Sequence, residues 1–197
     1  LYHVVEPYMR DFEEVLLRDI KTRLHDVLIA VKLDDEVDKE LVLKEKVNDI
    51  IIDYGLRLEP ITYHKILYYV LRDYLDLDKL TPLMSDPLIE DISCNGWDQP
   101  VFLFHKNYLN IQTNVHFNEV ESNSFVVKLA QKSGKHISIA EPMVDSTMPD
   151  GSRIQMTLGK EVTTHGSTFT IRKFKDVPIS PVDLIGWKTF SSESMAY

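Results

Sequence analysis

The spacing of apolar residues changes near residue 86, and this change limits the chain to a fold with two unlike parts. Before it, apolar side chains recur every three or four residues, as at Val15, Leu16, Ile20 and Leu24, which is the spacing of one buried helix face. After it, apolar and polar residues alternate along short segments, as in strands. Only one of the seven glycines precedes residue 90. We therefore predict an α+β fold.

Three helices are predicted in the first part. The first includes residues 15–31, the second covers 39–54, and the third follows Pro60. Gly55 is well placed to end the second helix, because glycine readily adopts the left-handed conformation found after a helix. Short connections between the three helices predict a small bundle.

The second part is predicted to be a mixed α/β unit with a mainly antiparallel, PAS-like sheet. Residues 100–104 and 109–115 alternate on either side of a polar turn, which indicates a hairpin. A helix then ends at Gly134. Two further strands are expected at 153–158 and 168–173, the first of them opened by an Asp-Gly turn.

Charge is distributed unevenly between the two parts. Residues 1–90 contain 20 acidic and 12 basic residues, a net of −8, whereas 91–197 contain 11 and 10, a net of −1. The acidic run 34–40 lacks the glycine and the spaced acceptors of a calcium loop. We interpret it as the solvated start of the second helix.

Basic residues gather in one segment of the second part. Residues 128–175 contain eight Lys or Arg against four Asp or Glu, a local net of +4 in a chain whose formal charge is −9. Lys128, Lys132 and Lys135 lie near the carboxyl end of the predicted helix. We interpret these three lysines as a solvated face compatible with the helix dipole.

Two arginines stand out in the second part, since Arg153 and Arg172 are its only arginines. Alternation places Ile154 and Ile171 on the inner faces of their strands, which leaves both arginines on the polar faces. If the two strands pair, both guanidinium groups could converge on one anion, and their planar forks suit phosphate. The alternative interpretation is that both arginines only form surface ion pairs, and the spacing does not decide between the two interpretations.

The sequence holds no complete catalytic centre. Gly134-Lys135 and Gly159-Lys160 lack the upstream glycine and the following hydroxyl residue of a phosphate loop. The seven histidines lack the close paired spacing of metalloproteases. The single cysteine, Cys94, cannot form an internal disulfide, which favours a reducing compartment, and it is interpreted as a small hydrophobic residue.

Six segments carry a family resemblance: Asp86–Gly96, Pro100–His105, Leu129–His136, Glu141–Asp145, Pro149–Ile154 and Thr168–Lys173. They closely resemble the amino-terminal region of the archaeal secretion ATPases, which drive archaella and type IV pili and belong to the type II and type IV secretion ATPase superfamily. The resemblance is specific from about residue 86 to Phe190 and looser before that, where Tyr2–Pro7 still looks like the family.

The resemblance implies a nucleotide-binding role. Such proteins form hexamers in which a mobile amino-terminal domain lies over a RecA-like core, and ATP with Mg²⁺ binds between them. Arg153 and Arg172 match family arginines that reach the nucleotide phosphates. We expect Ser191 to cap a helix that leads into the core, and only the first turn of that helix falls within the sequence. Hydrolysis would then belong to the longer parent, and this fragment alone should be inactive, without tightly bound nucleotide.

The resemblance also implies an organisation and partners. Residues 1–85 would form the helical bundle, 86–177 the sheet unit that covers the nucleotide, and 178–197 a linker and the first turn of the helix toward the core. The expected partners are that core, neighbouring subunits of a homohexamer, and a membrane platform protein. The location that the resemblance implies is the cytoplasm, at the inner face of the cell membrane. No apolar run approaches the roughly 18 residues that span a bilayer, so we expect no segment to cross it.

A second interpretation comes from a different class of function. The chain could be a non-enzymatic interaction module whose acidic bundle binds a basic platform partner and whose basic segment holds an acidic partner. The negative net charge of −9 and the lack of interleaved aromatic and basic residues argue against nucleic acid. The sequence does not say which appendage or secretion system the parent would drive.

Overall fold

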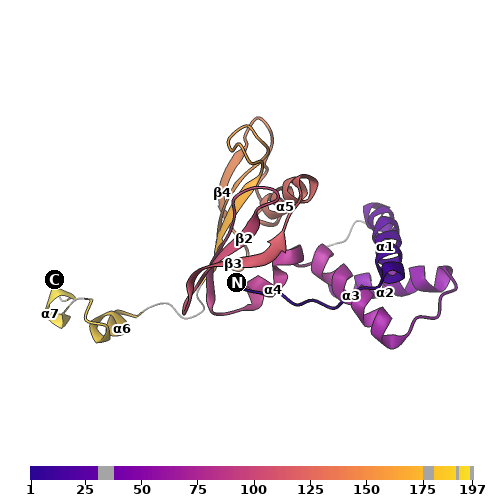
Figure 1. Cartoon of the computed structure of the whole chain (residues 1–197), viewed down its shortest axis with the longest axis horizontal. Helices are drawn as coiled ribbons and strands as arrows, with labels where there is room; N and C mark the ends of the chain where they lie inside the picture. Colours follow the sequence, from indigo (N-terminus) through magenta and orange to yellow (C-terminus); the bar gives the residue numbers. More distant parts are fainter. Residues whose placement is uncertain (31–37, 175–179, 190, 196–197) are drawn as a thin grey trace.

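The computed structural model describes residues 1–30, 38–174, 180–189 and 191–195, which form a helical body and a sheet body (Figure 1). The helical body consists of α1 (Asp11–Ala30), α2 (Lys39–Asp53) and α3 (Pro60–Tyr74). The three predicted helices are therefore confirmed. The part of the acidic run that precedes Asp38 lies outside the described residues.

The ends of these helices follow from local chemistry. The Asp38 side chain caps α2 by accepting hydrogen bonds from the backbone N–H groups of Glu40, at 3.0 Å, and Leu41, at 3.3 Å. After α2, Gly55 takes the left-handed conformation with φ 65°, as expected from its place in the sequence. Pro60 occupies the first turn of α3, where backbone N–H groups have no partner within the helix, so the missing N–H of proline costs no hydrogen bond.

The helical body has its own apolar core. Each helix contributes one face, and several of these side chains are completely buried. The core residues are Met9, Leu17, Ile20, Leu24, Leu43, Val47, Ile50, Ile51, Ile66 and Val70. The packing of these faces, more than helix propensity, holds the three helices together.

The sheet body contains six strands, all paired antiparallel, in the order β3-β2-β1-β6-β5-β4. The predicted α+β class with its antiparallel sheet is confirmed. The strands are β1 (Ile89–Cys94), β2 (Pro100–His105), β3 (Leu109–His116), β4 (Met143–Thr147), β5 (Arg153–Thr157) and β6 (Thr168–Arg172). Of these, β1 and β4 were not among the predicted strands.

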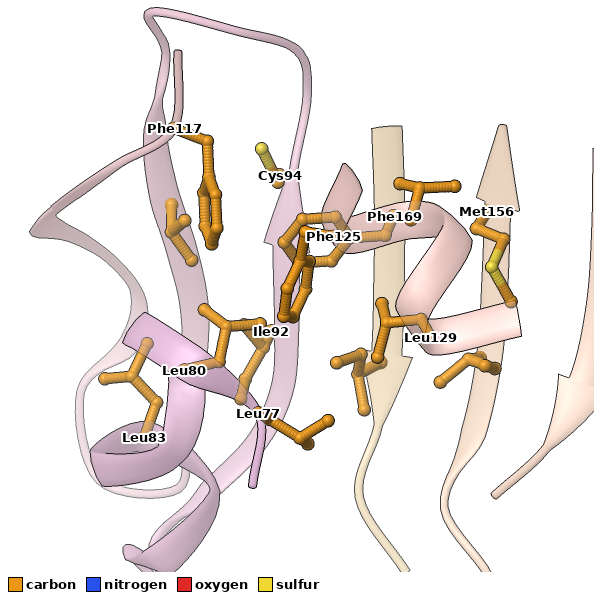
Figure 2. Packing of buried hydrophobic residues seen from close by; sticks show 14 of the residues in the cluster. Leu77, Leu80, Leu83, Ile92, Cys94, Phe117, Phe125, Leu129, Met156 and Phe169 are labelled. Atoms are coloured by element: carbon orange, nitrogen blue, oxygen red, sulfur yellow. The ribbon is translucent and has the colours of Figure 1, made fainter. Parts of the chain in front are cut away.

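One face of the sheet is covered by helices. These are α5 (Glu119–Lys132), the short 3₁₀ helix η1 (Asp78–Leu80) and α4 (Thr81–Ser85). Figure 2 shows Phe117, Phe125 and Phe169 close together in this core, with ring centroids 5.1–5.7 Å apart. The inward residues of β5 and β6 are as predicted, since Ile154 and Ile171 are buried.

The two cores are separate, and the change from one to the other falls between Leu75 and Leu77. Leu75 packs against the helical core, whereas Leu77, Leu80 and Leu83 belong to the core of the sheet body. The domain boundary predicted after residue 85 stays a prediction. The change from the helical core to the sheet core falls about ten residues before that boundary, because η1 and α4 pack on the sheet.

An amino-terminal strap, residues 2–7, contacts both bodies. At one end, the backbone N–H of Tyr2 donates to the Gln112 carbonyl of β3 at 2.8 Å, and the Tyr2 hydroxyl donates to Asp86 at 2.8 Å. At the other end, Glu6 accepts two hydrogen bonds from Nη1 of Arg72 on α3, at 2.6 and 2.7 Å. The strap therefore joins the edge of the sheet to the last turn of α3.

Two lysines of α5 also join the bodies, which corrects their interpretation as a solvated face. Nζ of Lys128 donates to the Asp73 carbonyl at 2.6 Å, and Nζ of Lys132 donates to the carbonyls of Leu75 and, at 2.8 Å, Asp76. These carbonyls end α3 and lack helical partners, so ammonium groups cap them. Lys135 is exposed, as expected.

The described carboxyl end consists of two short helices, α6 (Pro181–Gly186) and α7 (Ser192–Met195), beyond the sheet body in Figure 1. The predicted cap is confirmed, because the backbone N–H of Ser194 donates to Oγ of Ser191 at 3.2 Å. The linker at 175–179 and the expected continuation of the last helix at 196–197 lie outside the described residues.

Candidate anion-binding site

The two arginines singled out in the sequence are direct neighbours. Strands β5 and β6 pair antiparallel, and Arg153 lies opposite Arg172 in their register. Directly opposite residues have Cβ atoms about 4.5–5.5 Å apart. Both side chains point away from the core, with 72% of the Arg153 side chain and 76% of the Arg172 side chain exposed. The strand pairing that was set as the condition for the two guanidinium groups to converge is therefore present.

This pairing is unfavourable on its own, because like charges directly opposite each other destabilise a sheet. One carboxylate flanks each arginine. Oδ1 of Asp91 on β1 accepts a hydrogen bond from Nε of Arg172 at 3.0 Å. Oδ1 of Asp145 on β4 lies 3.9 Å from Nη2 of Arg153, beyond hydrogen-bonding distance. The two arginines thus face each other between two carboxylates.

Neutral polar groups and aromatic rings extend the same face of the sheet. Gln155 and Thr170, one row along from the arginines, lie opposite each other and are both exposed. On β2, the half-buried Phe102 and Phe104 lie opposite Ser93 and Asp91 of β1. The face therefore combines cationic donors, neutral hydrogen-bonding groups and apolar area.

The turn before β5 fixes where Arg153 begins the strand. Gly151 has φ 86° and donates its N–H to the Met148 carbonyl at 2.9 Å. A Cβ at Gly151 would lie 3.0 Å from Cγ of Phe174, so the turn suits glycine for two reasons. The side chain of Asp150 also accepts from the backbone N–H of Ser152 at 2.9 Å. The Asp-Gly signal in the sequence thus corresponds to a hydrogen-bonded turn.

Thr157 and Thr168 lie opposite each other on the face that carries the arginines, at the end of the two strands away from them. Thr157 is buried, and its hydroxyl lies 2.8 Å from that of Thr168. Thr163, in the loop that connects β5 to β6, approaches the Thr157 hydroxyl at 3.4 Å. The loop therefore covers this end of the face, and the exposed site is limited to the rows nearer the arginines.

Sequence reasoning missed the two carboxylates of the site, because it missed their strands. The register of β1 with β2 shifts between Ile89 and Asp91, and this irregularity leaves Ile89 and Ile92 both buried although they are three residues apart. Strict alternation fails there. In β4 the single buried residue is Ser146, so that strand carries little apolar signal.

The described ranges hold neither a metal-binding cluster nor a membrane-spanning helix. No group of three or more His, Cys, Asp or Glu side chains in them is arranged to hold a metal ion. None of the described helices has the length and apolar character needed to cross a membrane.

Comparison with known proteins gives relatives without an assigned role. No family model matches the chain. Three proteins of Methanocaldococcus jannaschii, each named only as uncharacterized, are similar: MJ1288 is 38% identical over 82% of this chain, MJ0900 36% over 100%, and MJ0781 29% over 79%. The chain spans 65%, 34% and 23% of their respective lengths.

A solved structure gives a weak similarity. The VirB11 ATPase from the Brucella suis type IV secretion system, in complex with sulphate, matches 60% of this chain and 35% of its own, with a TM-score of 0.47 and 21% sequence identity. At that level the similarity carries no conclusion about function.

Proposed function

We propose that this chain is the amino-terminal, nucleotide-cupping domain of a hexameric ATPase motor that drives archaellum or type IV pilus assembly or protein secretion. The observation that carries the proposal is the cross-strand pair of Arg153 and Arg172 on the exposed face of the sheet. The same two residues match phosphate-contacting arginines in the family that the sequence motifs resemble. An anionic ligand would compensate the repulsion between the two arginines that Asp91 and Asp145 leave.

The residues of the face suit contacts with the phosphates of a nucleotide. They do not supply the other parts of a nucleotide-binding site. Arg153 and Arg172 would hold the terminal phosphates, and Gln155 and Thr170 offer further hydrogen bonds. The phosphate loop, the Mg²⁺ ligands and the catalytic glutamate would come from a RecA-like core in the same parent protein. Bound ATP with Mg²⁺ would supply the chemical energy of phosphoryl transfer.

The chain's own residues then respond to the charge of the bound nucleotide. Two guanidinium groups attract the terminal phosphate strongly in a cleft that excludes water. After hydrolysis and release this attraction is lost, and the sheet body can move away from the core. Such a change of domain position coupled to nucleotide state is a common form of mechanical output.

The helical body provides the second contact surface of the proposal. Residues 1–75, the strap and the helical body, contain 16 acidic and 11 basic residues, a net of −5, which suits a basic cytoplasmic loop of a membrane platform protein. The motor would therefore lie in the cytoplasm, at the inner face of the membrane. A pull-down of the platform protein by this chain, weakened by salt, is the expected result. Binding by the whole motor but not by this chain would remove the docking role.

The test of the ATPase role uses the full-length parent. We expect it to hydrolyse ATP, and we expect Arg153→Ala and Arg172→Ala each to lower kcat/KM by at least about tenfold, as arginines that stabilise transferring phosphate do. Arg57→Ala is the matched control, because Arg57 is exposed in the helical body. Hydrolysis that is unchanged in both variants, or absent from the parent, would overturn the proposal.

A further inference from the structure

The two arginines of the site are held unequally. Nε of Arg172 donates to Asp91 at 3.0 Å, and the Asp91 side chain is only 31% exposed because it lies within the sheet between β2 and β6. Arg153 has a 3.9 Å approach to Asp145, and 72% and 62% of these two side chains are exposed. One guanidinium is therefore fixed by a hydrogen bond and the other is not.

The position of the Asp91 contact matters as much as its distance. A guanidinium has five N–H donors, and Nε carries the one nearest the backbone. A carboxylate that accepts from Nε orients the plane of the guanidinium. The two terminal amino groups of the guanidinium keep donors for a second partner. Those terminal donors are the ones that bind phosphate oxygens in pairs. Asp91 thus leaves the phosphate-binding edge of Arg172 available.

We propose that Asp91 is a positioning residue, which orients Arg172 as the fixed phosphate anchor and leaves Arg153 as the adaptable partner that follows the terminal phosphate. This inference rests on the proposed phosphate-binding function. An arginine ordered before binding loses less side-chain freedom when the ligand arrives, and that difference corresponds to about two- to tenfold in affinity. Asp91 acts through Arg172 and does not itself touch the ligand.

A carboxylate beside an anion site has a second effect, since its charge repels the ligand. Two substitutions separate this effect from positioning. Asp91→Asn and Asp91→Ala both remove the charge, but only Asn keeps an oxygen that can accept from Nε of Arg172. Positioning therefore predicts a difference between Asn and Ala, whereas repulsion alone predicts that both bind more tightly than the wild type and to the same extent.

The experiment titrates the 197-residue chain with inorganic tripolyphosphate and follows the arginine Nε–H signals by NMR. We expect Asp91→Ala to bind about two- to tenfold more weakly than Asp91→Asn, and the Arg172 Nε–H signal to persist in the free Asn variant and disappear in the Ala variant. In an Arg172→Ala background the difference between the two should vanish. Backbone spectra of each variant report whether it is folded.

The pair of Arg153 and Asp145, which has no hydrogen bond between its members, provides the matched control. Asp145→Asn and Asp145→Ala should bind tripolyphosphate equally, because Arg153 has no hydrogen bond to lose. Equal binding by Asp91→Asn and Asp91→Ala, with the wild type still binding at the two arginines, would overturn the positioning role and leave the proposed function standing. Failure of the wild type to bind tripolyphosphate would instead remove the phosphate-binding role itself.

Discussion

The two bodies of the chain use arginine in opposite ways. In the helical body, Arg72 is 8% exposed, and Glu6 and Asp73 accept hydrogen bonds from its Nη1 and Nε. In the sheet body, Arg172 is mostly exposed, has one carboxylate partner and lies opposite another arginine. A charge whose donors are used within the fold supports the structure. A charge that faces a like charge on an exposed surface supports the proposed anion-binding role.

Electrostatics in the helical body show the same inward use of charge. Burial disfavours the charged form of Arg72, but hydrogen bonds to Asp73 and Glu6 outweigh it and raise its pKa. Glu13 is 0% exposed, and the hydrogen bond from the backbone N–H of Arg10 does most to lower its pKa to about 2, assisted by Thr62 and Lys65 against the effect of burial. These charges belong to the fold.

The largest expected effect tests whether the two cores are independent. Phe169→Ala should destabilise the sheet body by about 3–5 kcal/mol, because it leaves a cavity beside Phe117 and Phe125. Urea unfolding followed by tryptophan fluorescence in a Trp187→Phe background, where Trp97 alone reports on the sheet body, should shift strongly. The α1–α3 helices, followed by amide exchange, should shift much less. Equal shifts in both would show that the bodies unfold as one unit.

The second prediction compares the two arginines directly. Arg72→Met should lower the free energy of unfolding by about 3 kcal/mol, since Glu6 and Asp73 lose their buried partner. Arg172→Met should change it by less than about 0.5 kcal/mol, because exposed ion pairs contribute little. Urea unfolding measures both. Similar losses for the two variants would contradict the distinction between structural and binding charges.

The third prediction concerns pH. A carboxylate whose pKa falls from 4.5 in the unfolded chain to about 2 in the folded one stabilises the fold above pH 4.5. That contribution is lost as the pH falls toward 2, where both states are protonated. The Tm advantage of the wild type over Glu13→Gln should therefore be full at pH 6 and shrink between about pH 4.5 and 2. A constant difference across this range would rule out the lowered pKa.

The smallest expected effect lies at the junction between the bodies. Lys132→Met should reduce protection of the last turn of α3 by about 1 kcal/mol, because the carbonyls of Leu75 and Asp76 lose their donor. Lys135→Met, at an exposed position on the same segment, is the matched control. Hydrogen exchange measures the opening of this turn. Equal protection in the two variants would show that Lys132 does not join the bodies.

Much of the fold could be predicted because its signals are local. Apolar spacing gave α1–α3, alternation gave the β2–β3 hairpin, β5 and β6, and Gly55 and Gly134 marked two helix ends. The sequence pattern was weak in β1, where an irregular register breaks the period of two. It was equally weak in β4, an edge strand with little buried apolar surface.

The site was predicted in part for the same reason. Alternation within β5 and β6 was enough to place Arg153 and Arg172 on one face. Asp91 lies 81 residues before Arg172 in the chain, and no local sequence pattern predicts the contact between them. The burial of Arg72 was also hidden, because its partner Glu6 lies in the strap 66 residues earlier. Contacts between distant segments need the assembled fold.

The most direct test of the central claim is an NMR titration of this chain with tripolyphosphate. The account predicts shift changes centred on Arg153 and Arg172 and extending to Gln155 and Thr170, weakened by salt. An Arg153→Ala, Arg172→Ala double variant should lose them, whereas an Arg10→Ala, Arg57→Ala variant of equal charge keeps them. Shifts centred on Lys135, or shifts that survive the loss of both sheet arginines, would contradict the account.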